Sequence, residues 1–433
     1  MYQKRLFGRA MPYMFCIGMS CVGGMGAGIV LAAPLAADAR HADVLHTDVV
    51  EPDAALSLHE VVEKAYLRNP TQPILAARMA EVRARRTVAT SFLPQAPAVG
   101  MSAQNDAVGS GRGERDWQAE VELPVWLQGQ RNARKHVADA ADEDLAASRD
   151  SLKLQVAGYV REAIWDIRMN ANALELADLR LNTAMALEHD VQRRFEAGEL
   201  AKTDLMLAQN ERIIAETGRL RAEAELMHAR HRYIILTGLH TMPQQLDEAQ
   251  SALEDYSEQH PYYREAMSRL GLTQQARELA RLERRENPQV ILNARSQRGP
   301  FENAFNDSIG LKLRIPLDSP VRAAPIEAAA EMEVGRAQSA RDSLIYQLET
   351  AMHEAEHNLT VSRAELEMVT RQQALAQENL RLANKAFQLG ETDLVGLMRI
   401  QALAYEAERA LTTRRIQLQW DIARYNQAVG VLP

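Results

Sequence analysis

FEAGELAKTDLM (Phe195–Met206) and FQLGETDLVGLM (Phe387–Met398) share one pattern and lie 192 residues apart. Each stretch begins with an aromatic residue, has a glycine three positions later and ends in Leu-Met. The same offset of 192 relates further identical residues on both sides: Pro124 and Pro316, Gln209 and Gln401, Glu216 and Glu408, Arg232 and Arg424, Tyr233 and Tyr425, and Gly238 and Gly430. A single ungapped offset over such a span indicates a tandem duplication.

Long helices are predicted on both sides of the glycine in each stretch. No proline lies at 131–197 or 336–389, and the first of these runs contains one glycine, Gly158. At 1.5 Å per residue, such runs reach on the order of 100 Å. Gly198 and Gly390 supply the left-handed conformation that a chain reversal needs. Apolar residues recur before Gly198 at three- and four-residue steps, as is typical of a coiled coil: Leu152, Val156, Val160, Ile164 and Ile167. Each repeat is therefore predicted to form a long antiparallel αα-hairpin.

Each repeat is predicted to start with one helical stretch, roughly 58–92 in the first and 262–285 in the second. Two short segments follow in which apolar and polar residues alternate. In one of them, Trp117, Ala119 and Val121 stand between polar neighbours. These segments have about ten residues, the length of a tilted transmembrane strand. The intervening segments 106–114 and 298–306 are rich in Gly, Asn and Asp, as hairpin loops are. The polar residues that we expect to face a channel lumen are Glu120, Glu122, Arg295, Lys312 and Arg314. The alternative is a pair of soluble hairpins with one buried face.

The number of strands bears on the oligomeric state. Four strands are too few to close a barrel in a membrane, for which about eight is the minimum. An open sheet edge in lipid would leave backbone N–H and C=O groups without partners. If these strands cross a membrane, several copies of the chain must share one barrel.

The N-terminal residues are typical of a secretory signal. Lys4, Arg5 and Arg9 precede an apolar run and a stretch of small residues. We expect cleavage at about residues 37–39, which would remove both cysteines, Cys16 and Cys21. The alternatives are an N-terminal membrane anchor and a lipoprotein, although Gly18 stands where a lipoprotein has an aliphatic residue before Cys21. The predicted organisation is a signal peptide at 1–39, a first repeat at 56–240, a linker at 241–260 and a second repeat at 261–433. Strands are predicted at about 97–105, 116–124, 289–297 and 308–316, and long helices at about 128–197, 199–238, 320–389 and 391–430. The predicted fold class is mainly α with a small β part.

Two observations bear on other functions. The net charge of −8 makes nucleic acid an unexpected partner. His353-Glu354-Ala355-Glu356-His357 matches the zinc-protease motif H-E-x-x-H. The offset of 192 places Arg161-Glu162-Ala163-Ile164-Trp165 at the same point of the first repeat, without histidine. We therefore predict no enzyme, no cofactor and no metal site, although His353 with His357, and His228 with His231, are pairs whose spacing suggests a metal site.

The repeat, the long hairpins and the alternating strands together resemble the TolC-like outer-membrane efflux family from Leu58 to Pro433. The signature of its helix tips is similar to Phe195-Glu196-Ala197-Gly198 followed by Asp204-Leu205, and to Phe387-Gln388-Leu389-Gly390-Glu391. The resemblance implies a homotrimer in the outer membrane, in which twelve strands form one β-barrel and twelve helices continue it as a periplasmic tunnel. It also implies a passive channel for metal ions or small molecules, with a periplasmic adaptor and an inner-membrane efflux pump as partners. The short loops and the chain length are similar to the branch that serves heavy-metal pumps.

The same resemblance suggests which residues carry the function. The residues expected to dock on the adaptor are Phe195, Gly198, Glu199, Asp204, Leu205, Phe387, Gly390 and Glu391. Channels of the family often narrow the periplasmic entrance with acidic residues after the second tip. Here Gly396 and Arg399 occupy the candidate gate, so an acidic gate is in doubt. The alternatives are an outer-membrane duct for type I protein secretion and a soluble periplasmic coiled-coil scaffold.

Overall fold

The computed structural model describes residues 49–253, 255 and 257–433 of the chain. The predicted signal peptide, residues 1–39, lies outside the described residues. The described helices are α2 (Leu58–Arg68), α3 (Gln72–Thr90), α4 (Gln130–Glu196), α5 (Lys202–Thr237), α6 (Pro261–Leu282), α7 (Pro320–Gln388) and α8 (Leu394–Ala428). The described strands are β1 (Glu51–Asp53), β2 (Ala98–Asn105), β3 (Arg115–Pro124), β4 (Thr241–Pro243), β5 (Gln289–Arg298) and β6 (Asn306–Arg314). The described residues are thus mainly helical with a small β part, as predicted.

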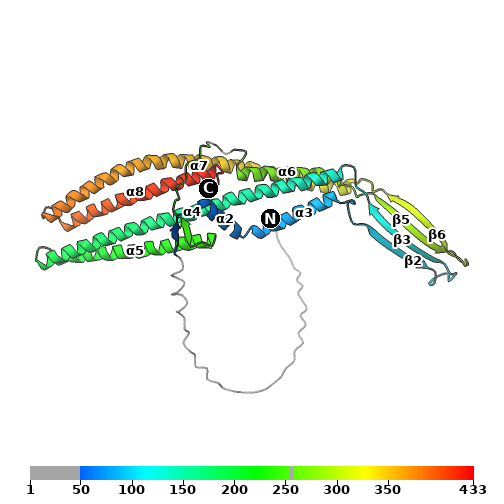
Figure 1. Cartoon of the computed structure of the whole chain (residues 1–433), viewed down its shortest axis with the longest axis horizontal. Helices are drawn as coiled ribbons and strands as arrows, with labels where there is room; N and C mark the ends of the chain where they lie inside the picture. Colours follow the sequence, from blue (N-terminus) through cyan, green and yellow to red (C-terminus); the bar gives the residue numbers. More distant parts are fainter. Residues whose placement is uncertain (1–48, 254, 256) are drawn as a thin grey trace, which may run out of the picture. The chain divides into compact units, whose positions relative to one another are not determined.

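Two long helical hairpins dominate the described part of the chain (Figure 1). Helices α4 and α5 form the first hairpin, and α7 and α8 form the second. Their tips lie at the same end of the helices, and the four-stranded sheet lies at the opposite end. The main apolar core lies where α4 packs against α2, α3, α5, α6 and α8. Val156, Val160 and Ile164 of α4 are buried in this core, at the four-residue spacing that places them on one helix face.

The segment before the first strands differs from the expected single helical stretch, 58–92. It forms two helices, α2 and α3, with Asn69 in an extended conformation between them. Pro70 explains the break, because a proline disfavours the helical conformation of the residue before it. The short strands β1 and β4 pair in parallel, and the sequence pattern did not indicate them.

The larger sheet is antiparallel, with strand order β2-β3-β5-β6. Its two central strands, β3 and β5, come from different repeats, so the sheet joins the repeats. The register aligns Val99, Val121, Leu292 and Leu311 in one row across all four strands. Side chains alternate between the two faces of a strand, so this row and its neighbours make one apolar face. No helix in the described part of the chain is both long and apolar enough to cross a membrane.

Candidate functional site

The predicted lumen residues lie on the opposite, polar face of the sheet. The register places Glu122 in one row with Ile291 and Lys312, and Glu120 in the next row with Asn293. Arg295 lies on the same face and forms a bidentate ion pair with Asp116, with nitrogen–oxygen distances of 3.0 and 2.7 Å. Asp116 could not be singled out from the sequence, because its partner is 179 residues away. The polar face therefore carries both charge signs, as the predicted residues suggested.

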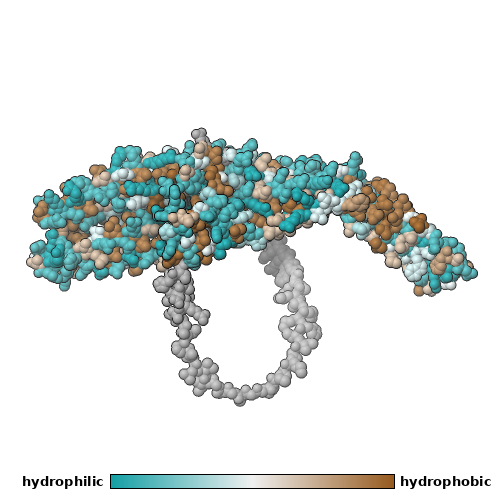
Figure 2. Space-filling model, viewed as in Figure 1, coloured by the Kyte–Doolittle hydropathy of each residue, from teal (hydrophilic) through white to brown (hydrophobic). Residues whose placement is uncertain are grey.

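The apolar face of the sheet is uncovered. Met101 is 83% exposed, Ile309 89% and Leu311 72%. Figure 2 shows hydrophobic residues gathered on the sheet next to the helices. Within the described residues, β2 and β6 each have one hydrogen-bonded neighbour, so both edges of the sheet are open. The face that soluble hairpins would have to bury is therefore exposed, together with two edges.

Both helix tips reverse the chain with the same backbone geometry. Gly198 has φ +79° and Gly390 has φ +74°, in the left-handed region. In the first tip, the backbone N–H of Glu199 donates to the Arg194 carbonyl oxygen at 2.9 Å. In the second tip, the N–H of Glu391 donates to the Ala386 carbonyl oxygen at the same distance. These bonds satisfy carbonyls at the helix end, as in a Schellman motif.

The helices that follow the two tips are capped in complementary ways. The Asp204 carboxylate accepts from the backbone N–H of Ala201 at 3.1 Å, three residues before it. In the second tip, the Asp393 carboxylate accepts from the backbone N–H of Gly396 at 2.8 Å, three residues after it. The offset of 192 makes Ala201 equivalent to Asp393 and Asp204 equivalent to Gly396. One carboxylate thus caps the start of each helix. In α5 it comes from the last residue of the four-residue capping turn, and in α8 it comes from the first.

The two tips share one apolar cluster. Leu205 and Phe387 are buried in it, and Phe195 packs against it. The Arg194 guanidinium lies 4.8 Å from the centre of the Phe387 ring, which links the two tips. Arg194 could not be identified from the sequence, because nothing local indicates which ring it contacts. Of the eight predicted docking residues, those with an exposed surface are Gly198, Glu199, Gly390 and Glu391. Leu205 and Phe387 instead hold the tips together.

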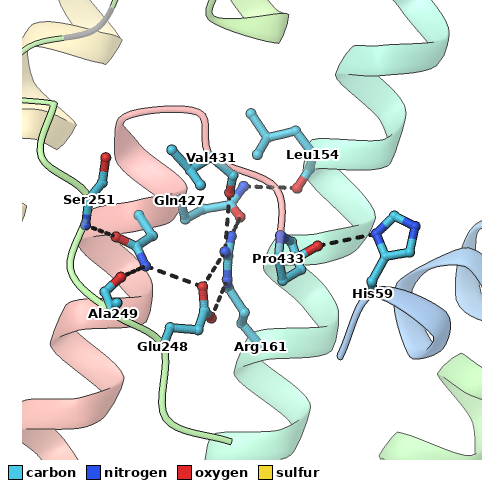
Figure 3. Close-up of polar contacts among 10 residues, drawn as sticks. His59, Leu154, Arg161, Glu248, Ala249, Ser251, Gln427, Val431 and Pro433 are labelled. Carbon is cyan, nitrogen blue, oxygen red and sulfur yellow. Dashed lines mark hydrogen bonds and ion pairs between the residues drawn. The ribbon is translucent and has the colours of Figure 1, made fainter. Parts of the chain in front are cut away.

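A buried ion pair lies where the repeats meet near the chain's C-terminal residues (Figure 3). Arg161 of α4 is 3% exposed and donates to both carboxylate oxygens of Glu248, at 2.8 and 2.6 Å. Arg161 also donates to the Gln427 side chain at 2.7 Å and to the Val431 carbonyl oxygen at 3.1 Å. Asn426 donates to Glu248 in turn, at 3.2 Å. This junction fixes the inter-repeat segment and the end of α8 against α4.

Solved structures of several outer-membrane proteins are similar to this arrangement of sheet and hairpins. The outer-membrane protein VceC of Vibrio cholerae matches with a TM-score of 0.69 and 14% identity, covering 87% of this chain and 97% of that one. The Campylobacter jejuni outer-membrane channel CmeC matches with a TM-score of 0.67 and 12% identity, covering 86% and 85%. The open-state outer-membrane channel MtrE of Neisseria gonorrhoeae matches with a TM-score of 0.66 and 14% identity, covering 88% and 96%. The chain has the fold of these outer-membrane channels. No protein-family model and no curated protein sequence matches it.

The candidate gate lies in the first turns of α8 in this channel fold. Gly396 is half-buried, and its backbone N–H is held by Asp393. Arg399 is exposed. Asp393 uses its carboxylate to cap the helix, so the acidic residue nearest to Gly396 has a structural role here.

The two histidines of the zinc-protease pattern lie together on α7. Their rings are nearly parallel, with centroids 6.5 Å apart, and both side chains are exposed. In the described part of the chain, no group of three or more His, Cys, Asp or Glu residues is arranged to hold a metal ion.

Proposed function

We propose that this chain is the outer-membrane channel subunit of a tripartite efflux system. In this proposal it is a passive conduit for metal ions or small molecules, and it is not an enzyme. Three copies would close one β-barrel from twelve strands and one periplasmic tunnel from their helical hairpins. The observation that carries the proposal is the sheet with an uncovered apolar face and two open edges.

The open edges explain why one copy would be insufficient. Backbone N–H and C=O groups on an edge strand lack partners, and in lipid each such group costs several kcal/mol. Pairing β6 of one copy with β2 of the next would satisfy both edges and close the sheet. The apolar face, with Met101 and Ile309, would then contact lipid. The face with Glu120, Arg295 and Lys312 would line the channel, so its mixed charges favour neither ion sign strongly.

The exposed ends of the helix tips would dock on a periplasmic adaptor, which would connect the channel to an inner-membrane pump. Glu199 and Glu391 occupy equivalent positions of the two tips and are both exposed. A basic surface on the adaptor would therefore suit the tips. Docking would favour an open arrangement of the hairpins if the adaptor binds that arrangement more tightly.

One preparation can test both parts of the proposal. The chain is purified in detergent from the outer-membrane fraction, and its mass is measured by light scattering with the detergent subtracted. We expect a mass of three chains. The same protein is then tested for binding to its adaptor, alongside a Glu199→Lys/Glu391→Lys variant and a control, Glu367→Lys, whose side chain is exposed on α7.

The outcomes separate the alternatives. A trimer that loses adaptor binding only in the tip variant supports the whole proposal. A trimer with unchanged binding in that variant would remove the docking assignment and keep the channel. A soluble monomer would overturn the channel and favour a periplasmic scaffold. Co-purification with a protein-secretion transporter in place of an efflux pump would favour a type I secretion duct.

A further inference from the structure

The segments that connect the sheet to the helices form a positively charged collar. We define the collar as residues 91–97, 125–136, 283–289 and 312–322. It contains eight basic and three acidic residues, a net charge of +5, whereas the whole chain carries −8. Because the charges of the chain are so unevenly placed, the collar is a local site of attraction for anions.

Contacts between the four segments hold the collar together. The Trp126 indole N–H donates to the Phe92 carbonyl oxygen at 2.9 Å, and the Arg134 guanidinium lies 5.4 Å from the Trp126 ring centre. Arg134 also pairs with Glu283 at 2.7 Å. Arg322 pairs with Glu286 at 2.8 Å, which joins the last two segments. The collar is therefore a single surface built from both repeats.

Internal ion pairs use up the acidic residues of the collar. Glu283 and Glu286 pair as described, and Asp318 pairs with Arg284 at 3.0 Å. Five basic residues remain, of which Lys312 and Arg314 lie on the polar face of the sheet. The other three are exposed and, within the described residues, form no ion pair: Arg131, Lys135 and Arg285.

Arg131 and Lys135 stand in the first two turns of α4, whose first turn has no acidic residue. A cation near a helix N-terminus meets the positive end of the helix dipole, which is unfavourable. These two cations therefore do not stabilise the start of their own helix. Arg131 instead donates to the carbonyl oxygen of Thr90 at 2.9 Å, close to Phe92.

The collar also contains large apolar side chains that are exposed. Phe92 is 88% exposed, Leu317 87% and Val321 86%, and all three lie in the collar just beyond the strand ends. An aromatic and aliphatic edge followed by cations is the arrangement that suits the boundary between hydrocarbon and head groups.

We infer that the collar binds the phosphodiester head groups of anionic phospholipids, through Arg131, Lys135 and Arg285. This inference rests on the proposed function, since it places the apolar face of the sheet in a bilayer. Phe92, Leu317 and Val321 would enter the acyl-chain region while the three cations contact phosphates. The collar thus sets the depth of the channel and selects the lipid of the leaflet nearest the helices.

The test measures which lipids stay bound to the full chain. The protein is reconstituted in nanodiscs of phosphatidylethanolamine and phosphatidylglycerol, and retained lipids are counted by native mass spectrometry. The test variant is Arg131→Gln/Lys135→Gln/Arg285→Gln. The matched control is Arg336→Gln/Arg371→Gln/Arg381→Gln, which removes three exposed charges of α7 outside the collar.

We expect the wild type and the control to retain phosphatidylglycerol over phosphatidylethanolamine by about fivefold or more, the effect of about one basic side chain at an anionic surface. The collar variant should lose this preference. An unchanged preference in the collar variant, with the mass of a trimer, overturns the lipid site and leaves the channel intact. Displacement of the lipid by inorganic phosphate would also overturn it, in favour of a simple anion site. A soluble monomer overturns both the site and the channel.

Discussion

One five-residue segment has opposite environments in the two repeats. Arg161-Glu162-Ala163-Ile164-Trp165 of α4 and His353-Glu354-Ala355-Glu356-His357 of α7 are equivalent under the offset of 192. In α4, Arg161, Ile164 and Trp165 are buried. In α7, the positions equivalent to these three residues are exposed, and two of them are the histidines.

The neighbours of the two helices explain this difference. Helix α4 packs against α2, α3, α5, α6 and α8, whereas the main partners of α7 are α6 and α8. A position enclosed by several helices requires apolar side chains or paired charges. A position on an outer face tolerates Glu and His. The two repeats thus share the lengths of their helices and the glycine turns between them. Their residues differ at positions that are buried in one repeat and exposed in the other.

The largest change in the free energy of unfolding is expected at the position where the two segments differ most in burial. Arg161→Ala would leave the largely buried Glu248 carboxylate without its counter-charge, which should lower the free energy of unfolding by about 3–5 kcal/mol. His353→Ala, at the equivalent position, should change it by less than about 0.5 kcal/mol. Denaturant titration followed by circular dichroism measures both values. Similar losses in the two variants would contradict the assigned difference in burial.

A smaller effect is expected from a tyrosine that the two repeats share. Tyr233 is buried and donates to the Thr241 carbonyl oxygen at 2.9 Å, and its equivalent Tyr425 donates to the Leu253 carbonyl oxygen at 2.6 Å. Each therefore ties its helix to the inter-repeat segment, residues 241–260. Tyr233→Phe leaves a carbonyl without this donor and should cost about 1–2 kcal/mol at pH 7. Tyr425→Phe should lower the stability by a similar amount. A large difference between the two losses would show that the two tyrosines do not have equivalent roles.

The same tyrosine predicts a pH dependence. Burial raises the pKa of Tyr233 to about 12, whereas an unfolded tyrosine has a pKa of about 10. Between these values the unfolded state loses the proton first, so the stability from Tyr233 is present below about pH 10 and is lost as pH rises toward 12. The stability difference between wild type and Tyr233→Phe should therefore shrink over this range. A difference that stays constant from pH 9 to 12 would contradict the burial of this phenol.

The smallest losses of stability are expected from substitutions at the helix tips. Asp204→Ala and Asp393→Ala each remove a carboxylate that caps a helix start, and each should cost about 1 kcal/mol. The two losses should be equal although the residues are not equivalent under the offset of 192. Hydrogen exchange of the first turns of α5 and α8 measures this locally. Faster exchange in only one variant would show that the two caps differ in strength.

The sequence predicted the parts of the molecule that depend on local patterns. Alternation along the strands predicted that Glu120, Glu122, Arg295, Lys312 and Arg314 face a lumen. The register puts them on one face of the sheet, and the lumen itself stays a prediction. The pattern missed Ile291, which is buried on that same face between Glu122 and Lys312. The break between α2 and α3 was also missed, although Pro70 was a usable signal.

Contacts between distant residues could not be predicted in the same way. The pairs Arg161 with Glu248, Arg295 with Asp116 and Arg194 with Phe387 join residues far apart in the sequence, and no period relates them. Among the tip residues, the sequence did not separate those that are buried, such as Leu205, from those that are exposed, such as Glu199. That distinction depends on how the two tips pack together.

The sequence alone determined the duplication, the long helices, the glycine reversals and the two faces of the strands. Each of these follows from backbone preferences and from side-chain periodicity within one element. Only the tertiary structure decided that α4 is enclosed and α7 is not, that β3 pairs with β5 across the repeats, and that the collar joins four separate segments. These properties depend on which elements meet in space, and a local pattern carries no information about its distant partner.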